Sequence, residues 1–78
     1  MPTAMVLVNS SVVRAIGYHK SLAILRIELA NGSAYDYHDV PQLTHEKIMR
    51  APSKGEYLNR EIKPKYKCTV VGTYTTAV

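Results

Sequence analysis

An Asn-Gly dipeptide at residues 31–32 is the feature that most constrains the fold, because it separates two segments that both have strand character. In residues 22–29, apolar side chains occupy every second position, while Arg26 and Glu28 fall between them. This period of two is typical of a half-buried strand. Residues 33–38 follow the turn and carry two of the tyrosines. Since Asn-Gly is a strong short-range signal for a β-hairpin, the sequence predicts an antiparallel pair here.

The length of the hairpin loop decides which side chains share a face. A two-residue loop would turn the carboxylate of Asp36 onto the apolar face of the preceding strand. A three-residue loop, closed by Gly32 in the left-handed conformation, would instead pair Asp36 with Arg26 on the outer face. An unpaired buried carboxylate is costly, so the longer loop is favoured. In that register Tyr35 and Tyr37 point into the core.

Shorter signals predict three further elements. Residues 12–18 are rich in β-branched and aromatic side chains and indicate a strand before the hairpin. Val40-Pro41 opens a helix, because proline suits a first helical position. Ser53 and Glu56 have the spacing of a capping box and begin a second helix, which ends at Lys63-Pro64. The expected inward side chains of the two helices are Val40, Leu43, Ile48, Ala51, Tyr57, Leu58 and Ile62.

Residues 67–78 leave two alternatives, a short strand or a frayed tail, because Cys68–Val78 is rich in threonine and valine. The predicted fold class is α+β: a three-stranded antiparallel meander followed by two short helices, with the fourth, C-terminal strand left open. We expect residues 1–78 to form a single domain, since either half would bury too little apolar surface to offset its chain entropy.

Composition narrows the class of protein. Apolar residues make up 46% of the chain and charged residues 21%, as in a globular protein. The longest aliphatic stretch near the start, residues 4–8, is far shorter than the roughly 20 residues of a membrane span, so we expect no membrane anchor. The single Cys68 excludes an internal disulfide and agrees with a reducing compartment. We expect a cytoplasmic location, with Cys68 as a small, half-buried residue.

The net charge of +4 is distributed unevenly along the chain. Residues 1–46 contain three Lys or Arg and four Asp or Glu, whereas residues 47–78 contain seven and two. A concentrated basic segment attracts phosphates or acidic partners, although a solvated basic face without such a role is equally common. The second helix and its exit carry the candidate phosphate-binding residues. These are Lys54, Arg60, Lys63, Lys65 and Lys67.

Three further candidates for nucleic-acid binding are Arg14, Tyr35 and Tyr37. An exposed Tyr-x-Tyr strand would present two rings suited to stacking on unpaired bases. The register favoured above places both rings in the core instead. Both readings stay open from the sequence alone.

Catalysis and metal binding have little support. His19, His38 and His45 do not have the spacing of a metal site, so we expect no metal and no cofactor. Nothing in the chain orders a nucleophile, a base and an orienting group, so we expect no enzyme. Ser10 and its neighbour Ser11 are more typical of backbone capping than of phosphate binding.

Several short motifs occur in a fixed order along residues 8–66. They are Asn9-Ser10-Ser11, Ala15-Ile16-Gly17-Tyr18, Asn31-Gly32, Tyr35-Asp36-Tyr37, Val40-Pro41, Ala51-Pro52-Ser53-Lys54-Gly55-Glu56-Tyr57, Asn59, Ile62-Lys63 and Tyr66. In this order they resemble the KTSC domain, a short module that occurs alone in bacterial and phage proteins and at the C-terminus of some lysyl-tRNA synthetases. The resemblance implies no established activity, and RNA binding is suggested for the family mainly by its attachment to a synthetase.

Two functions follow as hypotheses. The first is a small, basic, non-enzymatic RNA-binding module that contacts phosphates through the basic residues of the second helix. The second is a protein-interaction module that docks on a host or phage protein through a sheet edge or through its basic face.

Overall fold

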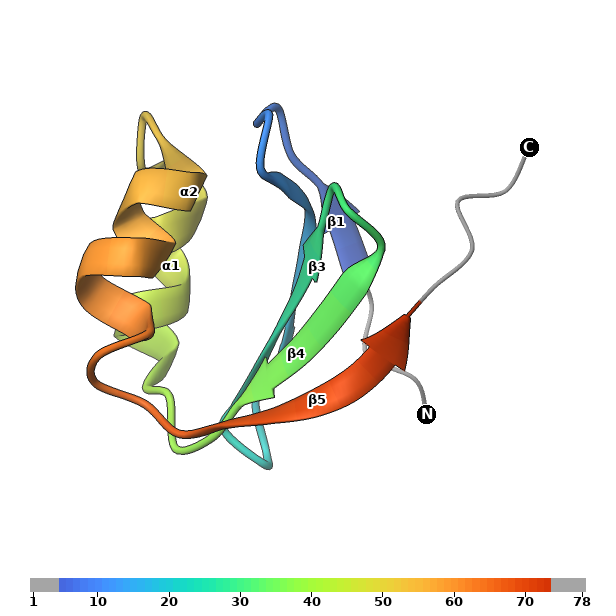
Figure 1. The fold of residues 1–78 in the computed structure, drawn as a ribbon. Helices are drawn as coiled ribbons and strands as arrows, with labels where there is room; N and C mark the ends of the chain where they lie inside the picture. The colour runs from blue at the N-terminus through green and yellow to red at the C-terminus, as the bar shows by residue number, and fades with distance from the viewer. Residues whose placement is uncertain (1–4, 74–78) are drawn as a thin grey trace.

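The computed structural model describes residues 5–73, which form an antiparallel sheet of five strands covered on one face by helices (Figure 1). The strands follow one another in the order β1-β2-β3-β4-β5. The elements are β1 (Met5–Leu7), β2 (Val13–His19), β3 (Ile24–Leu29), β4 (Ser33–Tyr37), α1 (Gln42–Arg50), α2 (Lys54–Tyr57), η1 (Leu58–Ile62) and β5 (Cys68–Thr73).

The α+β class is confirmed, but the sheet has five strands where the sequence predicts three with a fourth left open. Of the two alternatives for the C-terminal residues, a strand or a tail, the structure has a strand, since β5 pairs with β4 from Ser33↔Thr73 to Tyr37↔Cys68. Residues 74–78 of the predicted strand or tail lie outside the described residues. Strand β1 was missed because it has only three residues, and its pairing with β2, Met5↔Gly17 to Leu7↔Ala15, leaves no local signal.

The predicted hairpin register is confirmed. Arg26 lies opposite Asp36 and Ile27 lies opposite Tyr35, as the three-residue loop requires. Gly32 adopts φ 96°, and its N–H donates to the carbonyl of Leu29 at 3.1 Å. The left-handed residue therefore closes a type I turn, and the tyrosines face the helices.

The core lies between the sheet and the helices. Its fully buried large side chains are Val13, Ile16, Leu25, Ile27, Val40, Ile48, Leu58 and Ile62. Tyr37 joins them with 3% of its surface exposed, whereas Tyr35 is half-buried at the core's edge. Two expectations were wrong: Leu43 is 60% exposed, and Cys68 is exposed. Leu43 lies in the first turn of α1, in which His45 instead packs against the sheet.

The two helical pieces α2 and η1 form one continuous run with a widened final turn. The predicted cap is present, since Ser53 accepts a hydrogen bond from the N–H of Glu56 at 3.3 Å. Further on, the N–H of Lys63 donates to the carbonyl of Leu58 at 2.9 Å, five residues earlier. This π-helical turn brings Lys63 back toward the side of the helix that carries Leu58.

A tyrosine–histidine stack attaches α1 to the sheet. The rings of Tyr18 on β2 and His45 on α1 lie 4.9 Å apart and nearly parallel. The hydroxyl of Tyr18 donates to the carbonyl of Val40, just before the helix. Burial lowers the pKa of His45, and the nearby Glu46 opposes part of that shift.

Truncating the two hairpin tyrosines should have unequal effects on stability. We expect Tyr37→Ala to lower the free energy of unfolding by about 3–5 kcal/mol, because it removes a buried ring. Tyr35→Ala should cost less, since Tyr35 is half-buried. Urea titration followed by circular dichroism would measure both losses. An equal or larger loss for Tyr35→Ala would contradict this placement of the two rings.

Stability should also depend on His45 in mildly acidic solution. Its pKa is lower in the folded chain than its ordinary value of 6.5, so the unfolded chain binds the proton more tightly. The contribution of neutral His45 to the free energy of unfolding is fully present above pH 6.5 and is lost as the pH falls below that value. Thermal unfolding from about pH 7 to 5.5 should show this slope. His45→Phe, which keeps a ring against Tyr18 but does not titrate, should have a flatter profile.

Candidate functional site

The charged side chains of strands β2, β3 and β4 neutralise one another. Arg26 forms a two-pronged ion pair with Asp36, with distances of 2.7 and 3.0 Å, and this hydrogen bonding raises the pKa of Arg26. Arg14 contacts Glu28 at 2.7 Å. Arg14, predicted as a nucleic-acid contact, therefore lies in a sheet ion pair and is not brought together with the helical cations.

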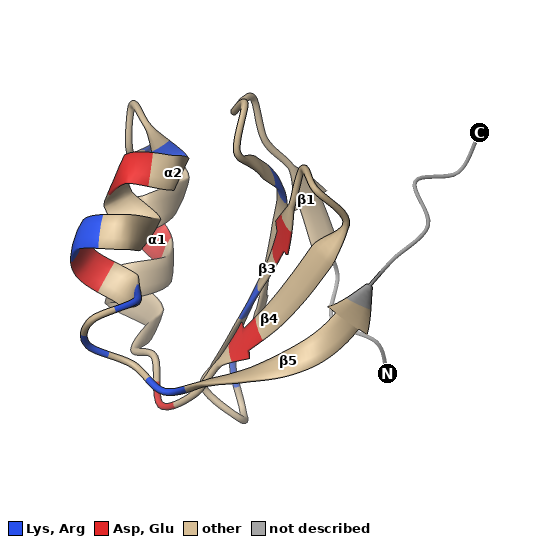
Figure 2. Cartoon of the chain, viewed as in Figure 1, with Lys and Arg blue, Asp and Glu red and all other residues tan. Residues whose placement is uncertain are grey.

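The excess positive charge lies on the helical layer, by which we mean residues 42–67. This segment contains seven Lys or Arg and three Glu, so its net charge equals the +4 of the entire chain. The remainder of the chain is balanced, with three basic and three acidic residues. Figure 2 shows blue and red alternating along α2 and η1, and then blue prevailing in the segment that leads to β5. The fold thus segregates neutralised and uncompensated charge into separate layers.

Glutamates of the same helix neutralise part of this positive charge through ion pairs. Arg60 contacts Glu56 at 3.5 Å and Glu61 at 3.2 Å, and Lys65 contacts Glu61 at 2.8 Å. The hydrogen bond from Lys65, and then that from Arg60, lower the pKa of Glu61. Lys54 forms no ion pair with a described residue, but its ammonium group donates to the carbonyl of Ala51 at 2.7 Å. Three of the five predicted phosphate-binding residues are therefore already engaged.

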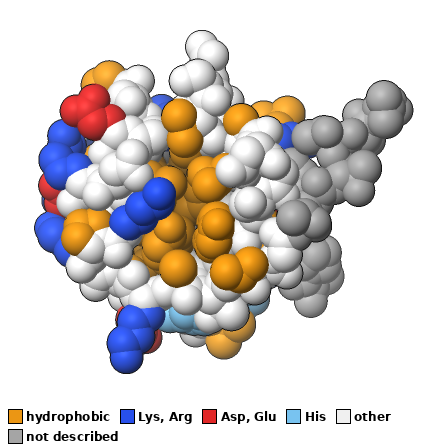
Figure 3. Space-filling model, viewed as in Figure 1, with side chains coloured by type: hydrophobic (Ala, Val, Ile, Leu, Met, Phe, Trp, Pro, Cys, Tyr) orange, Lys and Arg blue, Asp and Glu red, His pale blue; other side chains and the backbone are white. Residues whose placement is uncertain are grey.

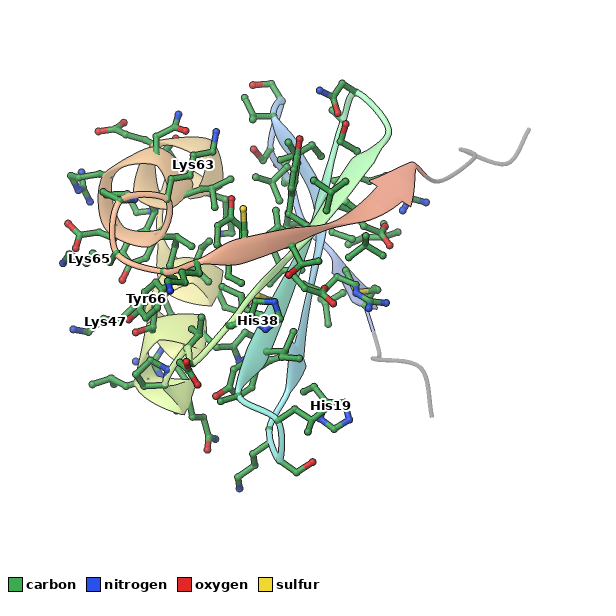
Figure 4. The ribbon with its side chains drawn as sticks, turned by 60° about the horizontal axis from the view of Figure 1, so that its bottom comes forward. His19, His38, Lys47, Lys63, Lys65 and Tyr66 are labelled. Atoms are coloured by element: carbon green, nitrogen blue, oxygen red, sulfur yellow. The ribbon has the colours of Figure 1, made fainter. Side chains whose placement is uncertain are left out.

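Four cations of the helical layer make neither an ion pair nor a side-chain hydrogen bond with any described residue. They are Lys47, Arg50, Lys63 and Lys67. In Figure 4, Lys47 and Lys65 project away from the sheet. Sequence reasoning missed Lys47 and Arg50 as site residues, although both lie in the last turn of α1, where cations oppose the helix dipole.

A basic groove of about 500 Å³ lies where α1 meets α2. Lys47 and Arg50 line it from α1, and Arg60 lines it from η1, with Glu56 as the acidic member. The guanidinium of Arg60 lies over the ring of Tyr57, 5.9 Å from its centroid, which is a cation–π contact. We call the groove that these residues line the α1–α2 groove. Its cations come from two elements that only the folded chain brings together.

A second groove of about 310 Å³, with a single charged residue in its lining, opens between the sheet and η1. It is lined by Leu29, Tyr35, Tyr37, Lys63 and Cys68, and we call it the sheet–helix groove. Figure 3 shows hydrophobic side chains exposed between the two layers, with a basic side chain beside the opening. Tyr37 is too buried for a base to stack on its ring, which corrects its prediction as a stacking residue, and burial raises its pKa to about 12. Tyr35 remains accessible from the groove.

The histidines and serines considered from the sequence have local partners. His38 lies at 2.7 Å from the hydroxyl of Thr69, and His19 lies at 3.3 Å from that of Ser21. Ser10 accepts hydrogen bonds from two backbone N–H groups at 3.2 Å, which confirms its capping role. Within residues 5–73, no three His, Cys, Asp or Glu side chains gather as a metal site. None of the helices in the same range is long and apolar enough to cross a membrane.

Comparison with known proteins places this geometry in a family. Residues 9–66 match the family model of the KTSC domain. A KTSC domain protein of Yersinia pestis has a crystal structure that superposes with a TM-score of 0.87 at 32% identity, and the match covers 91% of this chain and 100% of that one. The five-stranded α+β architecture is therefore shared with an experimental structure.

Two kinds of sequence relative are found. A protein of Tsukamurella paurometabola is 30% identical over 64 residues, which cover 82% of this chain and 96% of that protein. A lysine–tRNA ligase of Nostoc punctiforme is 40% identical over 59 residues, which cover 76% of this chain. The matched segment spans only 10% of the ligase.

Proposed function

The chain belongs to the KTSC domain family, and from this premise we propose that it is a small, non-enzymatic module that binds RNA through the phosphate backbone. The observation that carries the proposal is the location of the whole net charge of +4 on the helical layer, opposite a neutralised sheet face. Such a surface attracts a polyanion without reading its sequence.

The unpaired cations are the principal phosphate contacts in this proposal. Lys47 and Arg50 line the α1–α2 groove, and Lys63 and Lys67 continue the basic surface toward β5. Arg60 and Lys65 contribute when RNA phosphates compete with Glu56 and Glu61 for them. A similar segment occurs in a ligase named for its tRNA, which agrees with an RNA partner. The proposed location is the cytoplasm.

A protein partner is the second candidate, and the sheet edges favour it. Strand β5 is an edge strand whose Val70 and Val71 are 65% and 46% exposed. At the opposite edge, β1 exposes 71% of Leu7. Edge strands offer unpaired N–H and C=O groups to an added strand. The partner would be a bacterial or phage protein that pairs with one of these edges.

Titration with RNA at two salt concentrations tests the main proposal. Affinity for single-stranded RNA and tRNA should fall steeply with salt, with a slope of about −0.7 in log–log form for each phosphate that a cation neutralises. Absence of binding at low salt would reject it. The edge-strand alternative would be favoured if affinity capture from nuclease-treated lysate returned one protein. That protein should stay bound at high salt and should no longer be captured by the Val70→Lys variant.

Charge-reversal variants distinguish an effect of the helical layer on RNA binding from an effect of total charge. Lys47→Glu should weaken RNA binding and reduce the magnitude of the salt slope by about 0.7, as expected for one lost phosphate contact on a single strand. Lys20→Glu is the matched control, because Lys20 is exposed in the β2–β3 turn, outside the helical layer. Fluorescence anisotropy with labelled RNA measures both. Equal losses would show that only total charge matters.

Removing the carboxylate of Glu61 should strengthen RNA binding. Glu61→Gln removes the carboxylate that pairs with both Arg60 and Lys65, so Lys65 is released and Arg60 keeps only its longer contact with Glu56. Glu46→Gln makes the same change in total charge at an exposed site of α1 without releasing a cation from an ion pair with a described residue. The affinity gain should be larger for Glu61→Gln. If the two gains are equal, the ion pairs do not restrain these cations.

A further inference from the structure

Two tyrosines in the lining of the sheet–helix groove have hydroxyls without a hydrogen-bond partner among residues 5–73, in contrast to those of Tyr18 and Tyr66. The Tyr18 hydroxyl donates to the carbonyl of Val40, and the Tyr66 hydroxyl lies 3.2 Å from that of Thr44. The hydroxyls of Tyr35 and Tyr37 form no hydrogen bond with any described residue.

Both hydroxyls keep some solvent-accessible surface. No buried side-chain polar atom of the described chain lacks a partner, so both unpartnered hydroxyls reach open space. Tyr35 and Tyr37 both line the sheet–helix groove, and Tyr37 has only 3% of its surface exposed. The groove therefore has an apolar lining and two hydroxyls that can donate or accept hydrogen bonds. With a pKa of about 12, Tyr37 keeps its proton at neutral pH.

The lining of the sheet–helix groove also contains a cation. Lys63 lines the same groove, is exposed, and forms no ion pair with a described residue. The π-helical turn of η1 brings it to this side, whereas a regular helix would point it away with Arg60. An apolar groove of about 310 Å³ with a few convergent polar groups has the character of a ligand site.

We propose that the sheet–helix groove holds one unpaired nucleobase of the bound RNA strand. The inference rests on the proposed function and deepens it, since it specifies single-stranded RNA. A base has two apolar faces and polar edges, which match the lining and the two hydroxyls. Its own phosphate is anionic, which matches Lys63, and Lys67 continues the positive surface along the strand. A base held in a duplex cannot enter, because its edge is paired and its faces are stacked.

The test compares an unstructured single-stranded RNA with the duplex that it forms with its complement. Cys68→Phe adds a ring to the groove lining without changing charge, since Cys68 lies exposed at the groove. Leu22→Phe is the control, because it also adds a ring without changing charge, and Leu22 is 61% exposed in the β2–β3 turn and lines neither groove. Fluorescence anisotropy measures affinity in low salt, and circular dichroism checks that each variant is folded.

We expect the original chain to bind the single strand more tightly than the duplex. Cys68→Phe should reduce affinity for the single strand by about tenfold, the order expected for losing one stacked base. Its affinity for the duplex should not change, and Leu22→Phe should leave both affinities unchanged. Equal affinity for the two RNAs, or equal single-strand binding by Cys68→Phe and the original chain, would overturn the groove inference while RNA binding stands. If neither RNA binds, the proposed function fails.

A measurement on the unaltered chain keeps the inference testable if Cys68→Phe does not fold. Nuclear magnetic resonance titration with the single strand should shift the amide signals of Tyr35, Lys63 and Cys68. The duplex should leave these signals in place and shift only those of the α1–α2 groove. Shifts confined to the α1–α2 groove with both RNAs would contradict a base in the sheet–helix groove.

Discussion

The left-handed glycine that closes the β3–β4 turn is the constraint on which the rest of the structure depends. Gly32 at φ 96° sets a three-residue loop, and that loop fixes which face each residue of β4 occupies. One step of register would bury Asp36 and expose both tyrosines. In the observed register Tyr37 fills the core, Tyr35 borders it, and Asp36 neutralises Arg26 on the outer face. Core, groove and charge distribution all follow from this one turn.

The same register explains why the molecule has one charged layer. Cross-strand ion pairs satisfy the arginines of the sheet, so that face has no excess charge to offer a polyanion. The helices have too few carboxylates to do the same, and Lys47, Arg50, Lys63 and Lys67 stay uncompensated by described residues. Surface ion pairs contribute little to stability, so this division matters more for binding than for folding.

The widened turn of η1 links the basic layer to the apolar groove. A regular helix would place Lys63 among the solvent-facing cations, whereas the π-helical hydrogen bond from Lys63 to Leu58 brings its side chain to the edge of the core. Such turns are frequent at functional sites because they shift one residue out of helical register. Here the shift places Lys63 in the lining of the same groove as Tyr35 and Tyr37. A basic residue in that groove could contact the phosphate of a base that the groove holds.

The sequence by itself determined the elements whose causes are local. The Asn31-Gly32 turn predicted the register, Ser53 predicted the start of α2, and the charge count located the basic half of the chain. It missed β1, it left β5 undecided, and it placed Leu43 and Cys68 on the wrong side of the surface. Only the tertiary structure decided these points, along with the pairing of Arg14 and the meeting of Lys47 and Arg50 with Arg60 in one groove. The physical reason is that edge pairing, burial and grooves depend on segments distant in sequence, which no local pattern of residues records.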